Sequence, residues 1–392
     1  MTERGPAQLR AGSAWALASV AVTLSAGLLR TIVTARFLGP SDIGLMGIAL
    51  LALGFVEAVA STGMDTALMA ERNDVESYLD PAFTIQIARG LIVSALLWIA
   101  APTLAWAFHN DAAVSVIRSV GTIAALRGLA NPAVVLVMRR LDFQRVFWWS
   151  LPEVLSSLCL AVVAGQAVGT IASYGMAPRM PRLVFHRQPL QALLRFGRFV
   201  SGSRALMYFS VNVDAAVVGL AMGTQALGFY QFATRVAELP VVTFTRAVAQ
   251  VALPALSDLH SNAAALARTW RAMLGWILAV NAAAAIVILL FGEAAIVALA
   301  GDRWLPAVPL MRILAVAMVF RAVVVLSGQL LDAVGQPALT MRLNAGRLAT
   351  LLVVLPPLAA WAGSHGVAQG VLLANAGAAL FALRLSARVT SS

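Results

Sequence analysis

The chain has 392 residues, of which 60% are apolar and only 11% are charged, and its mean hydropathy is +0.86. An ordinary soluble domain is about 45–50% apolar and about 25% charged, so this composition excludes a soluble globular protein. The apolar runs are continuous rather than alternating, which also excludes a transmembrane β-barrel. Since a spanning helix needs about 20 apolar residues, we predict an all-α polytopic membrane protein with about 11–12 transmembrane helices.

The positive charge of the chain is carried entirely by arginine. All 28 basic residues are Arg, and against 17 acids they give a net charge of +11 and a pI near 11.4. A nucleic-acid-binding protein gathers its basic residues on one polar face. Here they lie at the ends of apolar runs or inside them, so we exclude nucleic acid as a partner.

The residue types that usually bind metals and nucleotides form no recognisable site in this sequence. One cysteine, Cys159, and four His in separate loops lack metal-ligand spacing. A nucleotide-binding loop ending in Lys-Ser/Thr needs a Lys, which the chain does not contain. We therefore expect no metal, no cofactor and no ATPase activity.

Eleven apolar segments follow one another between short loops. In chain order they cover residues 12–34, 43–69, 83–108, 113–137, 147–174, 199–221, 226–253, 271–291, 293–300 continuing through 305–330, 344–362 and 366–386. The fifth segment lies between two Arg-rich loops and must cross the membrane an even number of times, yet it is too short for two full helices. We predict either a shortened or re-entrant hairpin broken near Pro152 and Gly165, or the loss of a segment there.

Arg-rich loops alternate with loops that contain little Arg, around Gly39, His109, Gly223, Gly301 and Gly363. Because cytoplasmic loops carry the excess of basic residues, this pattern predicts that both termini are cytoplasmic. The basic stretch 179–198 is then a cytoplasmic linker. It separates an N-terminal half-bundle, residues 1–178, from a C-terminal half-bundle, residues 199–392.

The two halves resemble each other in sequence. Arg36–Met46 aligns with Leu220–Tyr230 at an offset of 184 residues, with two glycines in register. Further along, Arg127 corresponds to Arg321 at an offset near 194. The chain is thus predicted to contain two similar half-bundles in the same orientation. Parallel repeats of this kind are typical of transporters whose substrate site lies between the halves.

The runs Arg30–Met69 and Arg195–Leu256 resemble the two half-defining segments of Wzx-like polysaccharide and oligosaccharide flippases. That family belongs to the multidrug/oligosaccharidyl-lipid/polysaccharide exporter superfamily. The resemblance implies that the chain moves an undecaprenyl-pyrophosphate-linked oligosaccharide across the bacterial inner membrane by alternating access, for exopolysaccharide, O-antigen or capsule synthesis. It also implies contact with membrane lipids, and makes a polysaccharide polymerase and glycosyltransferases candidate partners.

Charged residues inside apolar segments cost at least ~2.5–3.5 kcal/mol each on insertion scales, so they are the candidate site residues. The repeat aligns Arg30 with Asp214, which indicates either an Arg that exchanges between pyrophosphate and Asp214 or a permanent salt bridge. Arg204, Tyr208 and Asn212 recur at i, i+4 and i+8 on one helical face. That face suits a path for sugars and phosphate, unless Arg204 snorkels to the cytoplasmic surface.

Several further residues complete the candidate set. Arg235 and Glu238, spaced i and i+3, form either a ligand contact or a structural ion pair. Glu57 and Asp65 either bind a coupling proton or cation, or Asp65 is simply solvated. The predicted substrate-binding residues are therefore Arg30, Arg204, Tyr208, Asn212, Asp214, Arg235, Glu238, Arg321 and Arg347.

Three other hypotheses remain open at this point. A drug or cation exporter of the same superfamily predicts an aromatic and acidic cavity rather than an Arg-bearing one. A membrane glycan polymerase or ligase needs a sizeable external loop with catalytic groups, whereas the loops expected here are short, so we expect a transporter rather than an enzyme. A shortened paralogue with a structural role is the third.

Overall fold

The computed structural model describes residues 31–61, 75–134, 136, 162–176, 180–182, 187–240, 244–245, 248, 252, 256–257, 259 and 263–391. The part of the chain described is helical between short turns. Its helices are α2 (Pro40–Val59), α4 (Val75–Ala107), α5 (Ala113–Gly128), α8 (Val162–Met176), α9 (Arg187–Pro240), α11 (Ala263–Leu299), the 3-10 turn η2 (Asp302–Trp304), α12 (Ala307–Ala333) and α13 (Pro337–Ser391). Six helical stretches among these residues are long and apolar enough to cross a membrane. The all-α membrane fold predicted from composition is therefore confirmed.

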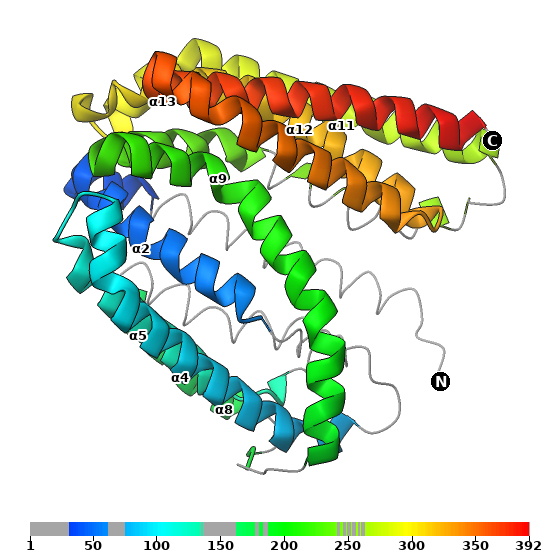
Figure 1. Cartoon of the computed structure of the whole chain (residues 1–392). Helices are drawn as coiled ribbons and strands as arrows, with labels where there is room; N and C mark the ends of the chain where they lie inside the picture. The colour runs from blue at the N-terminus through cyan, green and yellow to red at the C-terminus, as the bar shows by residue number, and fades with distance from the viewer. Residues whose placement is uncertain are drawn as a thin grey trace. The chain divides into compact units, whose positions relative to one another are not determined.

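The two longest helices are each broken into two arms (Figure 1). Gly223 has φ +81° in α9, and Gly363 has φ +58° in α13. Left-handed backbone of this kind is open to glycine at little cost. The predicted breaks between 221 and 226 and between 362 and 366 are thus confirmed.

One predicted boundary is wrong. Residues 293–299 continue α11 instead of joining the next segment, and the turn comes at Gly301, with φ +94°. Gly292, which separates the predicted segments 271–291 and 293–300, lies inside α11, where a Cβ would come within 2.4 Å of the Met311 methyl group. The glycine therefore serves close packing between α11 and α12 rather than a turn.

The region predicted as a shortened hairpin is described in part. Gly165 lies in the first turn of α8, while Pro152 and the other residues just before α8 lie outside the described residues, so the predicted break stays a prediction. α9 already begins at Arg187, so residues 187–198 of the predicted linker are helical. The number of crossings made by 147–174 stays a prediction.

The described helices group into two compact units. The first contains Ala49–Tyr208, and the second contains Ile32–Ile48 together with Phe209–Ser392. The predicted division at residues 178 and 199 stays a prediction.

In the first unit α5 packs against both α4 and α8. Gly90 and Gly128 bring α4 and α5 into backbone contact, and the Gln86 amide donates to the carbonyls of Arg127 (2.9 Å) and Ala130 (3.0 Å). Those carbonyls belong to a helix end, where intrahelical donors run out.

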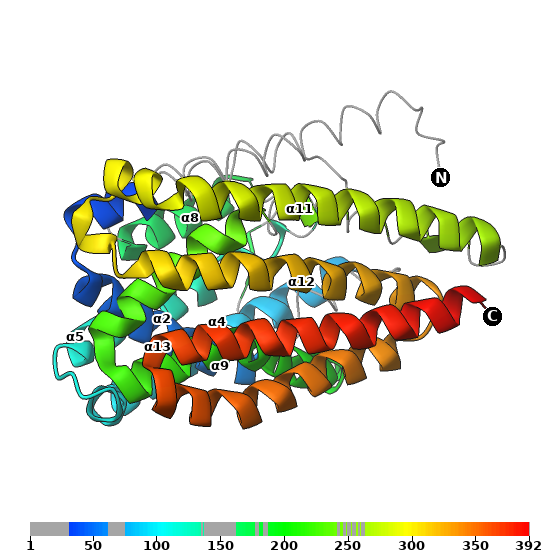
Figure 2. The ribbon, with the colours of Figure 1, turned by 90° about the horizontal axis from the view of Figure 1, so that it is seen from above.

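In the second unit, α12 packs against α11 and α13, and Figure 2 shows these helices lying side by side. Their core includes Trp270, Ile277 and Leu330. Trp304 of η2 is fully buried, packs against Phe232 with ring centroids 4.4 Å apart, and donates its indole N–H to the carbonyl of Ala35 at 2.9 Å. The early segment 32–48 is thereby tied to the end of α11.

The beginning of α2 crosses the second arm of α9 at backbone contact within this unit. A Cβ on Gly44 would lie 1.7 Å from the Thr224 carbonyl oxygen, and a Cβ on Gly228 would lie 1.8 Å from the Pro40 carbonyl oxygen. At the offset of 184 residues, Gly44 corresponds to Gly228 and Pro40 corresponds to Thr224. The two contacts are therefore equivalent in the repeat. The repeat found in the sequence therefore meets itself face to face, as two related surfaces do across a two-fold axis.

We predict that Gly44→Ala or Gly228→Ala lowers the thermal stability of the protein, because the methyl group has no space at the crossing. Overpacking of a tight contact costs about 1–3 kcal/mol or more. The measurement is thermal unfolding of purified protein in detergent. Gly275→Ala is the control, because nothing lies within 4 Å of a Cβ at that helical glycine. Equal melting temperatures for all three variants and the wild type would contradict the crossing.

Candidate functional site

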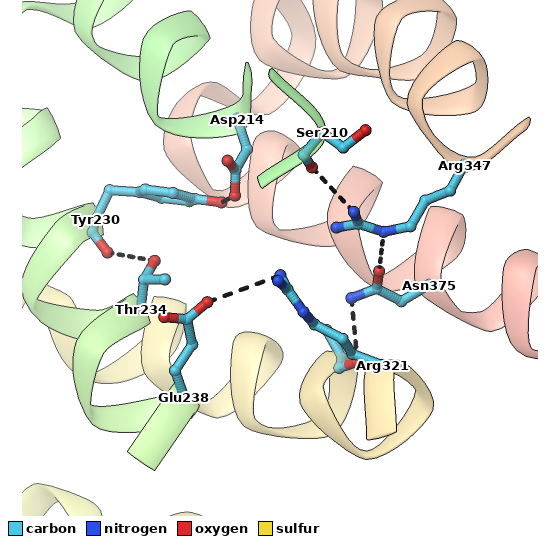
Figure 3. Close-up of polar contacts among 9 residues, drawn as sticks. Ser210, Asp214, Tyr230, Thr234, Glu238, Arg321, Arg347 and Asn375 are labelled. Atoms are coloured by element: carbon cyan, nitrogen blue, oxygen red, sulfur yellow. Dashed lines mark hydrogen bonds and ion pairs between the residues drawn. The ribbon is translucent and has the colours of Figure 1, made fainter. Parts of the chain in front are cut away.

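A cluster of charged side chains lies within the second unit (Figure 3). It contains Asp214 and Glu238 from the two arms of α9, Arg321 from α12 and Arg347 from α13. The cluster balances two acids with two guanidinium groups, on helices that are otherwise apolar. Charge at such positions must find polar partners inside the protein, and each of these residues does so.

Arg347 is the most buried of the four, with 8% of its surface exposed. Its Nε donates to Oδ1 of Asn375 at 2.7 Å, and its Nη1 donates to the Ser210 carbonyl at 2.9 Å. Asn375 in turn donates from Nδ2 to the Ala317 carbonyl at 3.1 Å. Arg347 thus links both arms of α13 with α9 and, through Asn375, with α12 (Figure 3).

Asp214 holds the two arms of α9 together. Its Oδ2 accepts a hydrogen bond of 2.7 Å from the hydroxyl of Tyr230, which is fully buried. Asp214 and Tyr230 lie on opposite sides of the break at Gly223, so their contact brings the arms close about two turns from that break. The charge of Asp214 is therefore committed to a structural hydrogen bond.

Glu238 and Arg321 form a looser contact. The Arg321 Nη1 lies 3.7 Å from Glu238 Oε1, which is an ion pair longer than a hydrogen bond. Both side chains remain partly exposed, 22% for Arg321 and 30% for Glu238. This pair is the accessible part of the cluster.

The first unit carries a Glu–Arg pair as well. The Nη1 of Arg127 donates to both carboxylate oxygens of Glu57, at 3.0 and 2.9 Å. In the same unit the hydroxyl of Tyr208 donates to the Leu51 carbonyl at 2.9 Å, and its ring packs against Gly54. Tyr208 therefore supports α2, whatever further role its face plays.

The structure brings four predicted site residues together: Asp214, Glu238, Arg321 and Arg347. Asn212 is half-buried on the same arm of α9 as Asp214, and Arg235 is exposed on the other arm. Arg30 and Asp65 lie outside the described residues, as does the side chain of Arg204, so the predicted exchange between Arg30 and Asp214 stays a prediction.

Two partners were missed by the sequence analysis. The structure shows an ion pair of Glu238 with Arg321 on α12, a partner that the spacing along one helix did not indicate, and the predicted pair of Arg235 and Glu238 stays a prediction. Asn375, which receives Arg347, was not singled out. A lone Asn inside an apolar segment is itself a signal, because an amide in hydrocarbon requires partners.

Comparison with known proteins now gives the family. Residues 33–309 match the family described as polysaccharide biosynthesis protein. This chain belongs to that family. It is 21% identical over 312 residues to the teichuronic acid biosynthesis protein TuaB of Bacillus subtilis (strain 168), and 18% identical over 380 residues to the lipopolysaccharide biosynthesis protein WzxC of Escherichia coli (strain K12). These alignments cover 75% and 92% of this chain, and 65% and 77% of the relatives, so the chain spans less than two thirds of TuaB.

Solved structures show the same fold. A multidrug resistance MATE family transporter of the MOP superfamily, in an inward-facing conformation, aligns with a TM-score of 0.75 and 16% identity over 94% of each chain. The lipid II flippase MurJ, in an inward closed conformation, aligns with a TM-score of 0.77 and 13% identity, over 95% of this chain and 87% of MurJ. The predicted all-α fold of two half-bundles is therefore confirmed.

We predict that Arg347→Met destabilises the protein, because it leaves Asn375 and the Ser210 carbonyl without their charged donor. Each buried polar group left unpaired costs about 1–3 kcal/mol. The measurement is the melting temperature in detergent, with Arg342→Met, an exposed position on the same helix, as the control. Arg347→Lys should fall between the two, because one ammonium cannot reproduce the fork of a guanidinium. An Arg347→Met variant as stable as the control would contradict this structural role.

Proposed function

We propose that this protein is a flippase that carries a lipid-linked oligosaccharide across the membrane by alternating access, with an undecaprenyl-pyrophosphate-linked repeat unit as the substrate. The observation that carries the proposal is the family match over residues 33–309, which lies on a polytopic helical bundle of the exporter fold. Three relatives, WzxC, TuaB and the succinoglycan biosynthesis transport protein ExoT, are named for polysaccharide assembly. ExoT, from Rhizobium meliloti (strain 1021), is 23% identical over 261 residues, covering 62% of this chain and 53% of ExoT.

The chemistry of the cluster supports an anionic substrate. A pyrophosphate group needs cationic donors that keep their charge inside a membrane, and a guanidinium does so while donating in a planar fork. Hydrogen bonds between ionised partners are about twice as strong as neutral ones. Arg321, partly exposed on an apolar helix, is placed to supply such a contact, while the isoprenoid tail stays among the lipids.

The rival hypothesis of a drug or cation exporter needs acids that are available to a cation. Asp214 is engaged by Tyr230, and Glu238 faces Arg321. The predicted coupling residue Glu57 is likewise engaged, by Arg127, so its binding of a proton or cation stays a prediction. Neither acid of the cluster is therefore available to a cation unless its present contact is broken.

A polymerase or ligase is supported less well. The turns described between α4 and α5, α11 and α12, and α12 and α13 are only a few residues long, which leaves no room there for a catalytic domain. We therefore propose a transporter that works beside a separate polysaccharide polymerase and glycosyltransferases. Its proposed location is the bacterial inner membrane, with both termini in the cytoplasm, as the distribution of Arg among the loops indicates.

The proposal predicts transport in reconstituted vesicles. Proteoliposomes that contain the purified protein and a fluorescent undecaprenyl-diphosphate-linked oligosaccharide should move the glycan between leaflets, measured as its accessibility to an added glycosidase. Arg321→Gln should reduce the rate at least tenfold. Arg312→Gln, on the same helix but in the exposed pair with Glu293, should transport at close to the wild-type rate, because exposed ion pairs contribute little.

Two outcomes would overturn the proposed function. One is wild-type protein that leaves the glycan in its original leaflet while exporting a cationic dye from the same vesicles. The other is a cell whose surface polysaccharide is unchanged after deletion of the gene.

A further inference from the structure

In the described part of each unit, a Glu–Arg pair lies at the same place in the helix order. Arg127 lies on α5 and Arg321 on α12, and the offset of 194 that relates them also relates the first residues of these helices, Ala113 and Ala307. Both arginines are thus equally deep from their helix starts. Their acids lie on the helices that meet at the glycine crossing, Glu57 on α2 and Glu238 on the second arm of α9. The arginines are thus in register, whereas the acids are 181 residues apart, about one helical turn from the offset of 184.

All four side chains of these pairs reach the surface of their unit. The exposed fractions are 45% for Arg127, 22% for Glu57, 22% for Arg321 and 30% for Glu238. A charge facing hydrocarbon costs at least ~2.5–3.5 kcal/mol on insertion scales. The exposed parts must therefore face water, on a hydrated surface of each unit.

These pairs differ in kind from the contacts of Arg347. Arg347 is almost fully buried and donates to a neutral amide and a backbone carbonyl. Arg127 and Arg321 face carboxylates, which are oxyanions, as phosphoryl groups are. Partly exposed ion pairs contribute only about 0–1 kcal/mol, so a second anion can displace the first at little cost. The pair at Arg321, with its atoms 3.7 Å apart, is the looser of the two.

Resting on the proposed function, we propose that Arg127 and Arg321 are the phosphoryl-binding residues of the two units, and that Glu57 and Glu238 are built-in competitors that occupy them when no substrate is bound. Within either unit, a phosphoryl group of the lipid diphosphate replaces the carboxylate as it arrives. As the substrate leaves, the carboxylate returns and neutralises the arginine. The acids therefore weaken binding and speed release.

The test is the affinity of purified protein in detergent for farnesyl diphosphate, a short prenyl diphosphate, measured by titration calorimetry. Glu57→Gln and Glu238→Gln keep the size of the side chain and remove its charge. Each should bind the probe three- to tenfold more tightly than the wild type, because the competing anion is gone. Arg127→Gln and Arg321→Gln should bind it at least tenfold more weakly.

Glu293→Gln is the matched control. Glu293 also pairs with an arginine, Arg312 at 3.1 Å, so its removal tests whether loss of any negative charge raises affinity. We expect its Kd to equal that of the wild type. Arg321→Lys, which keeps the charge, should recover part of the binding lost in Arg321→Gln.

A purely structural role for the pairs predicts a different pattern. The Gln variants of Glu57 and Glu238 would then melt at lower temperature and bind the probe no more tightly than the wild type, and that result overturns the proposal. The vesicle assay separates this failure from failure of the proposed function. Wild-type protein that flips the glycan, with Gln variants of unchanged affinity, would refute the competitor role alone. Gln variants that bind more tightly and transport more slowly would support it.

Discussion

The contact between Gly44 and Gly228 is the constraint on which the second unit depends. Because neither residue has a side chain, the start of α2 reaches the second arm of α9 at backbone distance. Gly47 continues the contact three residues later against the side chain of Gln231, its own counterpart at the offset of 184. This register places Ala35, before Gly39, within hydrogen-bonding distance of Trp304. It also places Glu238, on the second arm of α9, next to Arg321 of α12. A larger residue at either glycine would move all of these together.

Much of this arrangement could be predicted from the sequence, because its signals are local. Hydropathy gave the membrane class, and glycines marked the breaks at Gly223 and Gly363. The same reasoning failed at Gly292, since a glycine used for packing and a glycine used for a turn have the same sequence signal. The boundary between the described units, at residue 48 within α2, is also a tertiary property that no local pattern reveals.

For the site, the sequence identified the charges but not their partners. Spacing along one helix indicated Arg235 for Glu238, and it could not indicate the contact with Arg321 on another helix that the structure shows. Only tertiary packing separates Arg347, held by Asn375 and a carbonyl, from Arg321, which faces an acid. An arginine held by neutral acceptors and one held by a displaceable anion are chemically alike in sequence and different in what they can do.

The indole of Trp304 has a consequence for how the chain is made. Its hydrogen bond to Ala35 joins residues 269 positions apart, so the segment 32–48 enters the membrane long before its partner exists. At about 5–20 residues per second, that partner is synthesised roughly 15–50 s later. The glycine face of α2 meets its partners on α9 earlier, because Gly228 and Gln231 are synthesised before Trp304. The contact that anchors the segment 32–48 therefore forms only after the end of α11 has been made, and the contacts of α9 with α12 and α13 form later still.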